Sequence, residues 1–511
     1  MKFKLESRTQ KAKKNIGMSV LQNMINLGIT MAGRIVFARC LSSSYFGING
    51  LFANVLGMLS IADLGMTTAM MYRMYKPLAE NDQEKLASLV SFFRKVFLII
   101  AAVVFAVGIS LIPFLKYIVN LPSDIPNLYV FYFLNLIGTT MSYFFIYRTI
   151  LVTADQKNYL LVRSSIIFKI ITFVLQMVVL ICLKSYLGYL IIQISVSIVN
   201  NLYQNHIALK LYPFLRNIKP VKLPVNEIKS IFIDIKALFL YRISSVIQSN
   251  TDSIMISIFV GTITVGYYSN YTAITVNVVA ILNMIFNNLK AGVGNKVAMD
   301  DSGDDAYKLF RTMELFNYWL VLGSSIAIFV LSAPFMELCY GSEYVLSDIV
   351  VFAIVLNFYV NNIRQTMWAY REATGIFKQT QYITMVTATL NVVLSIIFGN
   401  LWGLFGIIIA TVLAKLLFAW WREPQILFGV CFHRNPISYY TTYIIRLLYG
   451  VLLGGIVHFV CRHLPAFNVL TTLILNTIVA AVLTLAGLLL YSFRQEEFKY
   501  LKGYFLKGLK K

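Results

Sequence analysis

Seven basic side chains lie inside apolar stretches that are long enough to cross a lipid bilayer. A charge at the bilayer centre costs about 2.5–3.5 kcal/mol even on the lenient scale derived from helix insertion, so several such charges predict a hydrated internal cavity. A positive cavity inside a membrane favours an anionic cargo. The seven residues are Arg34, Arg148, Lys169, Arg242, Arg364, Lys415 and Arg446.

The depth of these side chains separates two roles. Long basic side chains near a predicted cytoplasmic end can extend to the headgroups, and we expect this of four: Arg148, Arg242, Lys415 and Arg446. Arg34 and Arg364 lie deeper, so we expect them to line the cavity, and Lys169 fits either role.

Polar residues recur at three- and four-residue spacing, which places them on one face of a helix. We expect these stripes to face the cavity together with the basic residues. The stripes are Asn23, Asn26, Thr30 and Arg34; Asn49, Ser60, Asp63 and Thr67; Arg242, Ser245, Ser249 and Asp252; Asn270 and Asn277; and Asn357, Asn361, Arg364, Trp368 and Arg371. Most of the amides and hydroxyls would also fit a purely structural role, because such groups hold transmembrane helices together.

Asp63 and Asp252 are the only acids deep inside the predicted spans. Two interpretations stay open. They could neutralise Arg34 or Arg242 as ion pairs, or they could titrate and couple transport to protons.

The elements that position these residues follow from composition. Of 511 residues 58% are apolar and only 13% are charged, and the mean hydropathy is +0.72. Because a hydrocarbon core of about 30 Å needs about 20 apolar residues per helix, we predict an all-α polytopic membrane protein with about 14 spans. They cover 16–38, 47–72, 96–115, 128–152, 159–182, 186–207, 237–260, 266–289, 315–338, 349–370, 380–399, 402–421, 439–460 and 468–492.

The net charge of +22 reflects topology. With the N-terminus inside, Lys and Arg concentrate in the inner loops and tails, so we expect both termini in the cytoplasm of a multi-pass cell-membrane protein. The scattered charges argue against a nucleic-acid partner and fit anionic lipid. The five cysteines and four histidines form no paired or clustered spacing, and we expect no metal, no cofactor and no catalytic site.

An internal repeat divides the chain. Several residues recur about 221 positions later: Pro113-Phe114 as Pro334-Phe335, Thr153 as Thr374 and Lys157 as Lys378. A second match, Phe46-Gly47 and Val265-Gly266, precedes the second span of each half. We predict two pseudo-symmetric six-helix lobes, 1–209 and 237–421, joined by a cytoplasmic linker at 210–236 and followed at 422–511 by two further spans and a basic tail.

Several segments resemble a known family. They are Gly33–Phe37, Tyr45–Phe52, Ala62–Gly65, Tyr75–Ala79, Asn250–Asp252 and Val265–Tyr271. The chain is similar over nearly its whole length to the bacterial lipid-linked oligosaccharide flippases of the Wzx type, in the MOP exporter superfamily that also holds MurJ and the MATE exporters. One departure is Asp63, where the family more often has glutamate.

The resemblance implies a flippase that moves undecaprenyl-diphosphate-linked repeat units to the outer leaflet, for capsule, exopolysaccharide or O-antigen assembly, and not an enzyme. Polymerases and glycosyltransferases are the implied protein partners. The site candidates are Arg34, Arg364, Lys169, Arg242 and Arg371 for the diphosphate, with Asp63, Asp252, Asn26, Asn270 and Asn361 as polar or ion-coupling residues. Two alternatives stay open, a cation-coupled multidrug exporter of the same superfamily and a non-transporting scaffold of a glycan-assembly complex.

Overall fold

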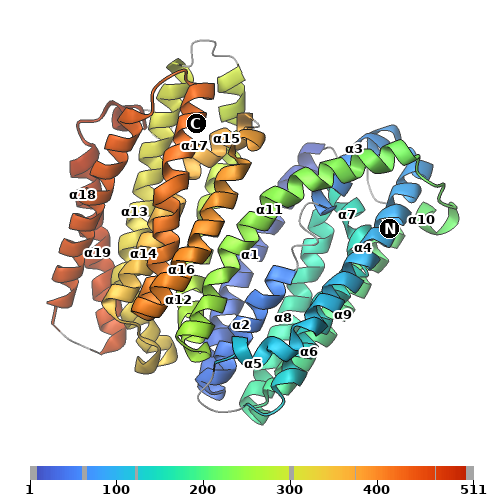
Figure 1. Cartoon of the computed structure of the whole chain (residues 1–511), viewed down its shortest axis with the longest axis horizontal. Coiled ribbons are helices and arrows are strands. Elements are labelled where there is room, and N and C mark those ends of the chain that lie inside the picture. The colour runs from blue at the N-terminus through green and yellow to red at the C-terminus, as the bar shows by residue number, and fades with distance from the viewer. Residues whose placement is uncertain are drawn as a thin grey trace. The chain divides into compact units, whose positions relative to one another are not determined.

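The computed structural model of the chain describes residues 8–59, 66–120, 125–298, 304–374, 376–465 and 468–501. The side chains of some helical stretches, among them 233–249 and 287–298, are also outside the described part. The described residues form helices and no strand (Figure 1). Contacts divide the chain into two units, Met1–Gly266 and Tyr267–Lys511.

The first unit is built around long helices that pack side by side. Helix α1 packs along α8, α8 along α9, and α11 against α2. The helices are Arg8–Cys40 (α1), Ser43–Leu59 (α2), Met66–Glu80 (α3), Gln83–Ser110 (α4), Leu115–Ile118 (α5), Leu128–Tyr143 (α6), Ile146–Ala154 (α7), Asn158–Leu183 (α8), Tyr186–Leu211 (α9), Phe214–Asn217 (α10) and Val225–Phe259 (α11).

In the second unit α13 is central, because it contacts α14, α18 and α19 (Figure 1). The helices are Thr262–Ala298 (α12), which begins in the first unit, Asp304–Tyr340 (α13), Asp348–Asn362 (α14), Gln365–Thr374 (α15), Phe377–Ala414 (α16), Trp420–Cys431 (α17), Ile437–Arg462 (α18) and Val469–Ser492 (α19). A π-helical turn, Lys415–Ala419, joins α16 to α17.

Each predicted span coincides with helical structure over most of its described residues, although turns interrupt the spans 128–152 and 349–370. Seven helices of this part are long and apolar enough to cross a membrane, or eight if α6 and α7, bent by 47°, count as one span. The protein is therefore an all-helical, multi-pass membrane protein. The count of 14 spans stays a prediction.

Helix α16 contains two predicted spans folded back on each other. Its one non-helical residue is Gly403, with φ +58° and ψ −132°. A Cβ at Gly406 would lie 1.9 Å from the carbonyl oxygen of Phe398, so only glycine fits the turn. Across the hairpin Asn391 Nδ2 donates to Thr411 Oγ1 at 2.7 Å.

Matching helix breaks support the internal repeat. Helix α6 ends at Tyr143 and α7 begins at Ile146, while α14 ends at Asn362 and α15 begins at Gln365, 219 residues further along in both cases. Each half thus interrupts the equivalent helix at the equivalent place. Such breaks free backbone groups inside the protein, where neighbouring helices must satisfy them.

The predicted linker is attached to the first unit. Lys85 on α4 forms an ion pair with Glu227 at the start of α11, and Arg73 Nη2 on α3 donates to Ser230 Oγ at 2.6 Å. The start of α11 is therefore held against α3 and α4. The predicted boundaries of the two lobes stay a prediction.

Candidate functional site

Arg34 lies beside an aromatic cluster of the first unit. Its guanidinium carbon is 5.7 Å from the ring centre of Phe46, and the side chain is half-buried. The ring of Phe37, one turn along α1, lies 5.4 Å from Phe46 and 5.1 Å from Tyr189 of α9, edge to face. Aromatic faces attract a guanidinium and hold its plane.

Hydrogen-bonding groups surround the same cluster. Tyr186 on α9 donates its hydroxyl to Asn49 Oδ1 on α2 at 3.2 Å, and Gln176 on α8 donates to the carbonyl of Tyr189 at 3.3 Å. Four helices thus bring a guanidinium, amides and phenols together. This set suits anionic oxygens and sugar hydroxyls.

The other predicted residues of the first unit differ in exposure. Asn26 is half-buried on α1, and Lys169 is exposed on α8. Asp252 on α11 is 6% exposed and is flanked by the buried Thr251 and Ser253. The cavity roles of these three residues stay predictions. Two candidates lie outside the described part, namely Asp63 altogether and Arg242 in its side chain.

In the second unit Arg364 and Arg371 share one carboxylate. Arg364 forms an ion pair with Glu423 of α17, and Arg371 Nη1 on α15 lies 2.8 Å from Glu423 Oε1. All three side chains are buried. Arg364 lies at the break between α14 and α15, within reach of Glu423 on α17. Two guanidiniums on one carboxylate leave a net positive charge.

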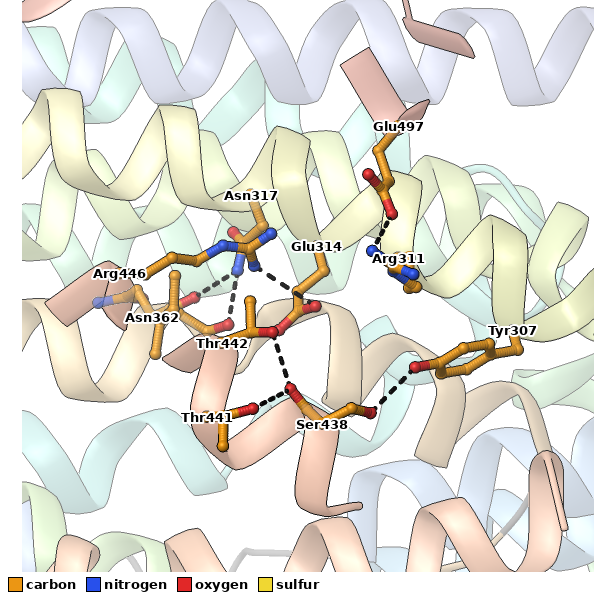
Figure 2. Close-up of polar contacts among 11 residues, drawn as sticks. Tyr307, Arg311, Glu314, Asn317, Asn362, Ser438, Thr441, Thr442, Arg446 and Glu497 are labelled. Atoms are coloured by element: carbon orange, nitrogen blue, oxygen red, sulfur yellow. Dashed lines mark hydrogen bonds and ion pairs between the residues drawn. The ribbon is translucent and has the colours of Figure 1, made fainter. Parts of the chain in front are cut away.

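A second buried ion pair lies between α13 and α18. Arg446 Nη1 is 3.4 Å from Glu314 Oε2, and both side chains are buried (Figure 2). Next to it, Asn317 donates to the carbonyl oxygens of Asn362 and Ile363 at 3.1 and 2.8 Å. These carbonyls are freed where α14 ends, so Asn317 satisfies the helix break.

Tyrosines of α18 connect the two ion pairs. Tyr439 is close enough to Glu314, Arg364 and Arg446 to interact with all three electrostatically. Tyr443, one turn further, lies near Arg364. The two buried ion-pair groups, around Glu423 and around Glu314, are therefore linked through α18.

Two expectations about basic residues are wrong. Arg446 and Lys415 do not extend to a headgroup layer, because Arg446 is 5% and Lys415 7% exposed. Lys415 Nζ instead donates to Asn357 Oδ1 at 2.9 Å. Packing of α13 against α18 and of α14 against the Lys415–Ala419 turn buries side chains that would otherwise reach the surface.

Asp252 is not the only buried acid among the residues that the structure describes, because Glu314 and Glu423 are buried as well. Both lie just beyond the ends of predicted spans, 315–338 and 402–421. A prediction based on hydropathy therefore placed both glutamates outside the membrane spans. One feature of the sequence could have identified them as partners of the buried arginines: each carboxylate lies within one or two residues of a span, in a chain with an excess of intramembrane arginine.

Two further polar candidates lie in the second unit. Asn270 on α12 is 1% exposed and Asn361 on α14 is half-buried. Their cavity role stays a prediction. The described residues contain no group of three His, Cys, Asp or Glu side chains that could hold a metal ion.

An apolar groove of about 1000 Å³ runs along α13 and α19. Small residues on both helices open it, among them Gly323, Ala327, Ala480 and Ala481. Its remaining lining is Phe316, Trp319, Leu320, Leu331, Thr477, Thr484, Leu485, Leu488, Leu489, Phe493, Phe498 and Leu501.

A polar pocket of about 590 Å³ lies at the start of the predicted linker. Tyr212 donates its hydroxyl to Asp155 Oδ2 at 2.8 Å, and Lys157 Nζ is 2.5 Å from the same oxygen. Burial, and then the carboxylate of Asp155, raise the pKa of Tyr212, so the hydroxyl stays protonated and keeps donating. The contact ties the end of α9 to the turn between α7 and α8.

Comparisons with known proteins agree with this architecture. A family model described as polysaccharide biosynthesis protein matches residues 12–288. Comparison with curated protein sequences finds no match.

Solved structures share the fold across most of the chain. The lipid II flippase MurJ, in an inward closed conformation, matches with a TM-score of 0.64 at 16% identity, covering 94% of this chain and 98% of its own. An inward-facing MATE multidrug transporter of the MOP superfamily matches with a TM-score of 0.61 at 14% identity, covering 80% and 94%. A MOP superfamily transporter from Pyrococcus furiosus matches with 0.55 at 12% identity, covering 83% and 97%. The fold is thus MurJ- and MATE-like.

Proposed function

The chain belongs to the polysaccharide biosynthesis protein family, and we propose that it is a flippase for undecaprenyl-diphosphate-linked oligosaccharide repeat units. It moves the headgroup from the cytoplasmic to the outer leaflet of the bacterial cell membrane by alternating access, and supplies capsule, exopolysaccharide or O-antigen assembly. Both termini lie in the cytoplasm. Glycosyltransferases and a polymerase act before and after it.

One observation carries the proposal, namely the half-buried guanidinium of Arg34 inside an aromatic and amide-lined cluster. A diphosphate carries about two negative charges that hydrocarbon excludes, and a guanidinium binds its oxygens bidentately. The neighbouring amides and phenols suit sugar hydroxyls. We assign the first contact with the diphosphate to Arg34, with Asn26 on the same helix.

The basic residues of the second unit have a different part in the cycle. Arg364 and Arg371 already share Glu423, so they bind the diphosphate only by exchanging that carboxylate for phosphate oxygens. Lys169 and Arg242 add positive charge. This exchange couples cargo binding to the bend between α14 and α15.

The apolar groove along α13 and α19 supports a lipid cargo. A polyprenyl chain is long, methyl-branched and wholly apolar, and the groove offers an apolar lining that includes several small residues. We assign the groove to the prenyl chain, which stays in the membrane while the headgroup crosses.

The return of the empty carrier needs a driving force. The membrane potential supplies about 2.3 kcal/mol per charge per 100 mV, and the carboxylates of Asp63 and Asp252 offer a counter-ion or proton. Asp252 is 6% exposed on α11, and burial favours the protonated or cation-bound form of a carboxylate.

Reconstitution tests the function. Purified protein in liposomes is given undecaprenyl-diphosphate carrying a fluorescent glycan, and translocation is followed by a quencher that does not cross the membrane. We expect faster translocation than in protein-free liposomes. A wild-type rate equal to the protein-free rate, with efflux of an organic cation instead, would assign the chain to the drug exporters.

The Arg34 assignment has its own test. We expect Arg34→Ala to slow translocation about 10- to 150-fold, the range of a lost hydrogen bond to a charged group, and Arg34→Lys to retain part of the rate. The control is Arg422→Ala, which removes an exposed guanidinium from α17. Wild-type translocation by Arg34→Ala would refute the assignment and leave the flippase proposal standing.

A further inference from the structure

The chain turns back on itself just after α19. Helix α19 ends at Ser492, residues 493 and 494 form a turn, and a short helix follows over 496–501. We call residues 493–501 the C-terminal strap. An isolated helix of six residues is not stable in water, so the strap keeps this shape through its contacts with the rest of the protein.

These contacts fasten the C-terminal strap to α13. Glu497 of the strap forms an ion pair with Arg311 of α13 (Figure 2). The ring of Phe498 stacks on that of Trp319, with the ring centres 5.6 Å apart and an angle of 24° between the planes. Trp319 Nε1 also donates to Ser492 Oγ at 2.8 Å, where α19 ends and the strap begins. The strap therefore crosses from α19 to α13.

The C-terminal strap also forms one end of the apolar groove along α13 and α19. Three of its side chains, those of Phe493, Phe498 and Leu501, belong to the lining of the groove. On α13 the lining runs over Phe316–Leu331, which is about 22 Å of helix. Phe498 stacks near the start of this range. The strap therefore walls the groove at the end where α13 begins and α19 ends.

A wall at this end matters for a lipid cargo with a large polar headgroup. With both termini in the cytoplasm, as proposed above, the C-terminal strap lies at the cytoplasmic end of the groove. The diphosphate of a newly loaded carrier lies on the same side of the membrane. Because the prenyl chain is covalently joined to that diphosphate, it has to leave the groove toward the headgroup. The strap stands in this path while it is fastened to α13.

We propose that the C-terminal strap is a gate that admits the prenyl chain to the groove from the cytoplasmic leaflet. The inference rests on the proposed function and adds a loading step before the headgroup crosses. In the closed state Glu497 is paired with Arg311, and Phe498 is stacked on Trp319. Opening breaks both contacts and leaves α19 in place.

The contacts of the C-terminal strap suit repeated opening. The side chain of Arg311 is 55% exposed, and water screens ion pairs at such positions, so they add little stability. A single aromatic pair adds a similarly small amount. Segments held by few contacts open locally while the rest of the protein stays folded, and binding-site lids are of this kind.

Amide hydrogen exchange of the purified full-length protein measures opening without any cargo. We expect Glu497→Gln to speed exchange in peptides covering 493–501 about two- to fivefold, the range of a lost surface ion pair. Glu497→Gln should add nothing once Arg311 is glutamine, because the pair is already broken. The control is Glu496→Gln, which removes an exposed carboxylate from the same strap. Wild-type exchange in both Glu497→Gln and Phe498→Ala would overturn the proposal.

Loading is tested with a polyprenyl phosphate that carries a photoreactive benzophenone at the far end of its chain. The probe is mixed with protein in nanodiscs, and samples are irradiated at intervals. We expect cross-links to the groove residues Leu485 and Leu489 to form about two- to fivefold faster in Glu497→Gln than in wild type or Glu496→Gln. Equal rates in all three would overturn the gate and leave the prenyl assignment standing. Wild-type protein without any groove cross-link would instead refute the prenyl assignment, and the gate with it.

Covalent closure of the C-terminal strap gives the converse test. Arg311→Cys and Glu497→Cys are combined in protein whose exposed Cys182 is replaced by serine, and a short bis-maleimide joins the two new thiols. We expect the groove cross-links to nearly disappear after bridging. The same variant before bridging is the control. Unchanged loading of the bridged protein would overturn the proposal.

Discussion

Gly47 and Gly266 are in backbone contact, although 219 residues separate them. A Cβ at Gly266 would lie 2.9 Å from the Gly47 amide nitrogen, and a Cβ at Gly47 would lie 2.2 Å from the carbonyl oxygen of Thr262. These are the glycines of the repeated pairs Phe46-Gly47 and Val265-Gly266. The two matching hairpins, α1–α2 and α11–α12, therefore touch through equivalent glycines. In the proposed alternating-access cycle, with the N-terminus in the cytoplasm, this contact is expected to open on the outer side.

Gly47→Ala should weaken that contact, because the new methyl group overlaps the backbone of Thr262. We expect a cysteine at Ile263, in the opposite hairpin, to react faster with a membrane-impermeant maleimide applied from outside. Mass spectrometry gives the fraction of protein labelled at this cysteine over time. Gly28→Ala is the control, since nothing lies within 4 Å of a Cβ there. Equal labelling in the two variants would argue against an outer gate at Gly47.

Glu423→Gln should destabilise the second unit by about 3–5 kcal/mol, because it leaves Arg364 and Arg371 buried without their shared carboxylate. Unfolding in mixed micelles measures the loss. Arg371→Gln should cost less, since it leaves Arg364 and Glu423 paired one to one. The charge-sharing account predicts this order, and a larger loss from Arg371→Gln would contradict it.

Gly406→Ala should destabilise the α16 hairpin by about 3 kcal/mol or more, since its Cβ would lie 1.9 Å from the Phe398 carbonyl oxygen. The fraction of monodisperse protein after solubilisation and the melting temperature report the change. Gly429→Ala on α17 meets nothing within 4 Å and should be neutral or slightly stabilising. Comparable melting temperatures for both variants would show that the turn can relax.

Gly323→Leu should narrow the apolar groove while the fold is kept, because nothing lies within 4 Å of a Cβ at this lining position. We expect slower translocation of undecaprenyl-linked glycans than of short-prenyl analogues in the liposome assay. Gly455→Leu on α18, which also meets no atom within 4 Å, does not line the groove and serves as the control. Equal slowing of long and short carriers would remove the groove from prenyl binding.

Hydropathy located the helices well where apolar runs are bounded by polar residues. The predicted spans 159–182 and 468–492 correspond to α8 and α19 within about one residue at each end. It placed the break near Gly403 as well, because a glycine and the polar Asn400 interrupt the apolar run. The predicted spans begin several residues after the true starts of α4 and α11, because the first turns of these helices are polar and hydropathy detects only their apolar part.

The same reasoning misjudged side chains near span ends. Arg446 and Lys415 were expected at the membrane surface, and Glu314 and Glu423 were left outside the spans. A position near the end of a helix is exposed or buried according to which neighbouring helix covers it, and spacing along one chain carries no information on that neighbour. Arg34 also lies near a helix end, six residues before α1 ends at Cys40, and it is the ring of Phe46 on α2 that its guanidinium meets.

The sequence by itself determined the class of protein, the places of most helices, the repeat and the intramembrane excess of basic residues, because each follows from local composition and period. Only the tertiary structure decided that Glu423 joins Arg364 to Arg371, that Glu314 meets Arg446 and that Gly47 meets Gly266. Those pairings are set by which helices pack together. Packing depends on the shapes of surfaces brought together from distant parts of the chain, which no local pattern encodes.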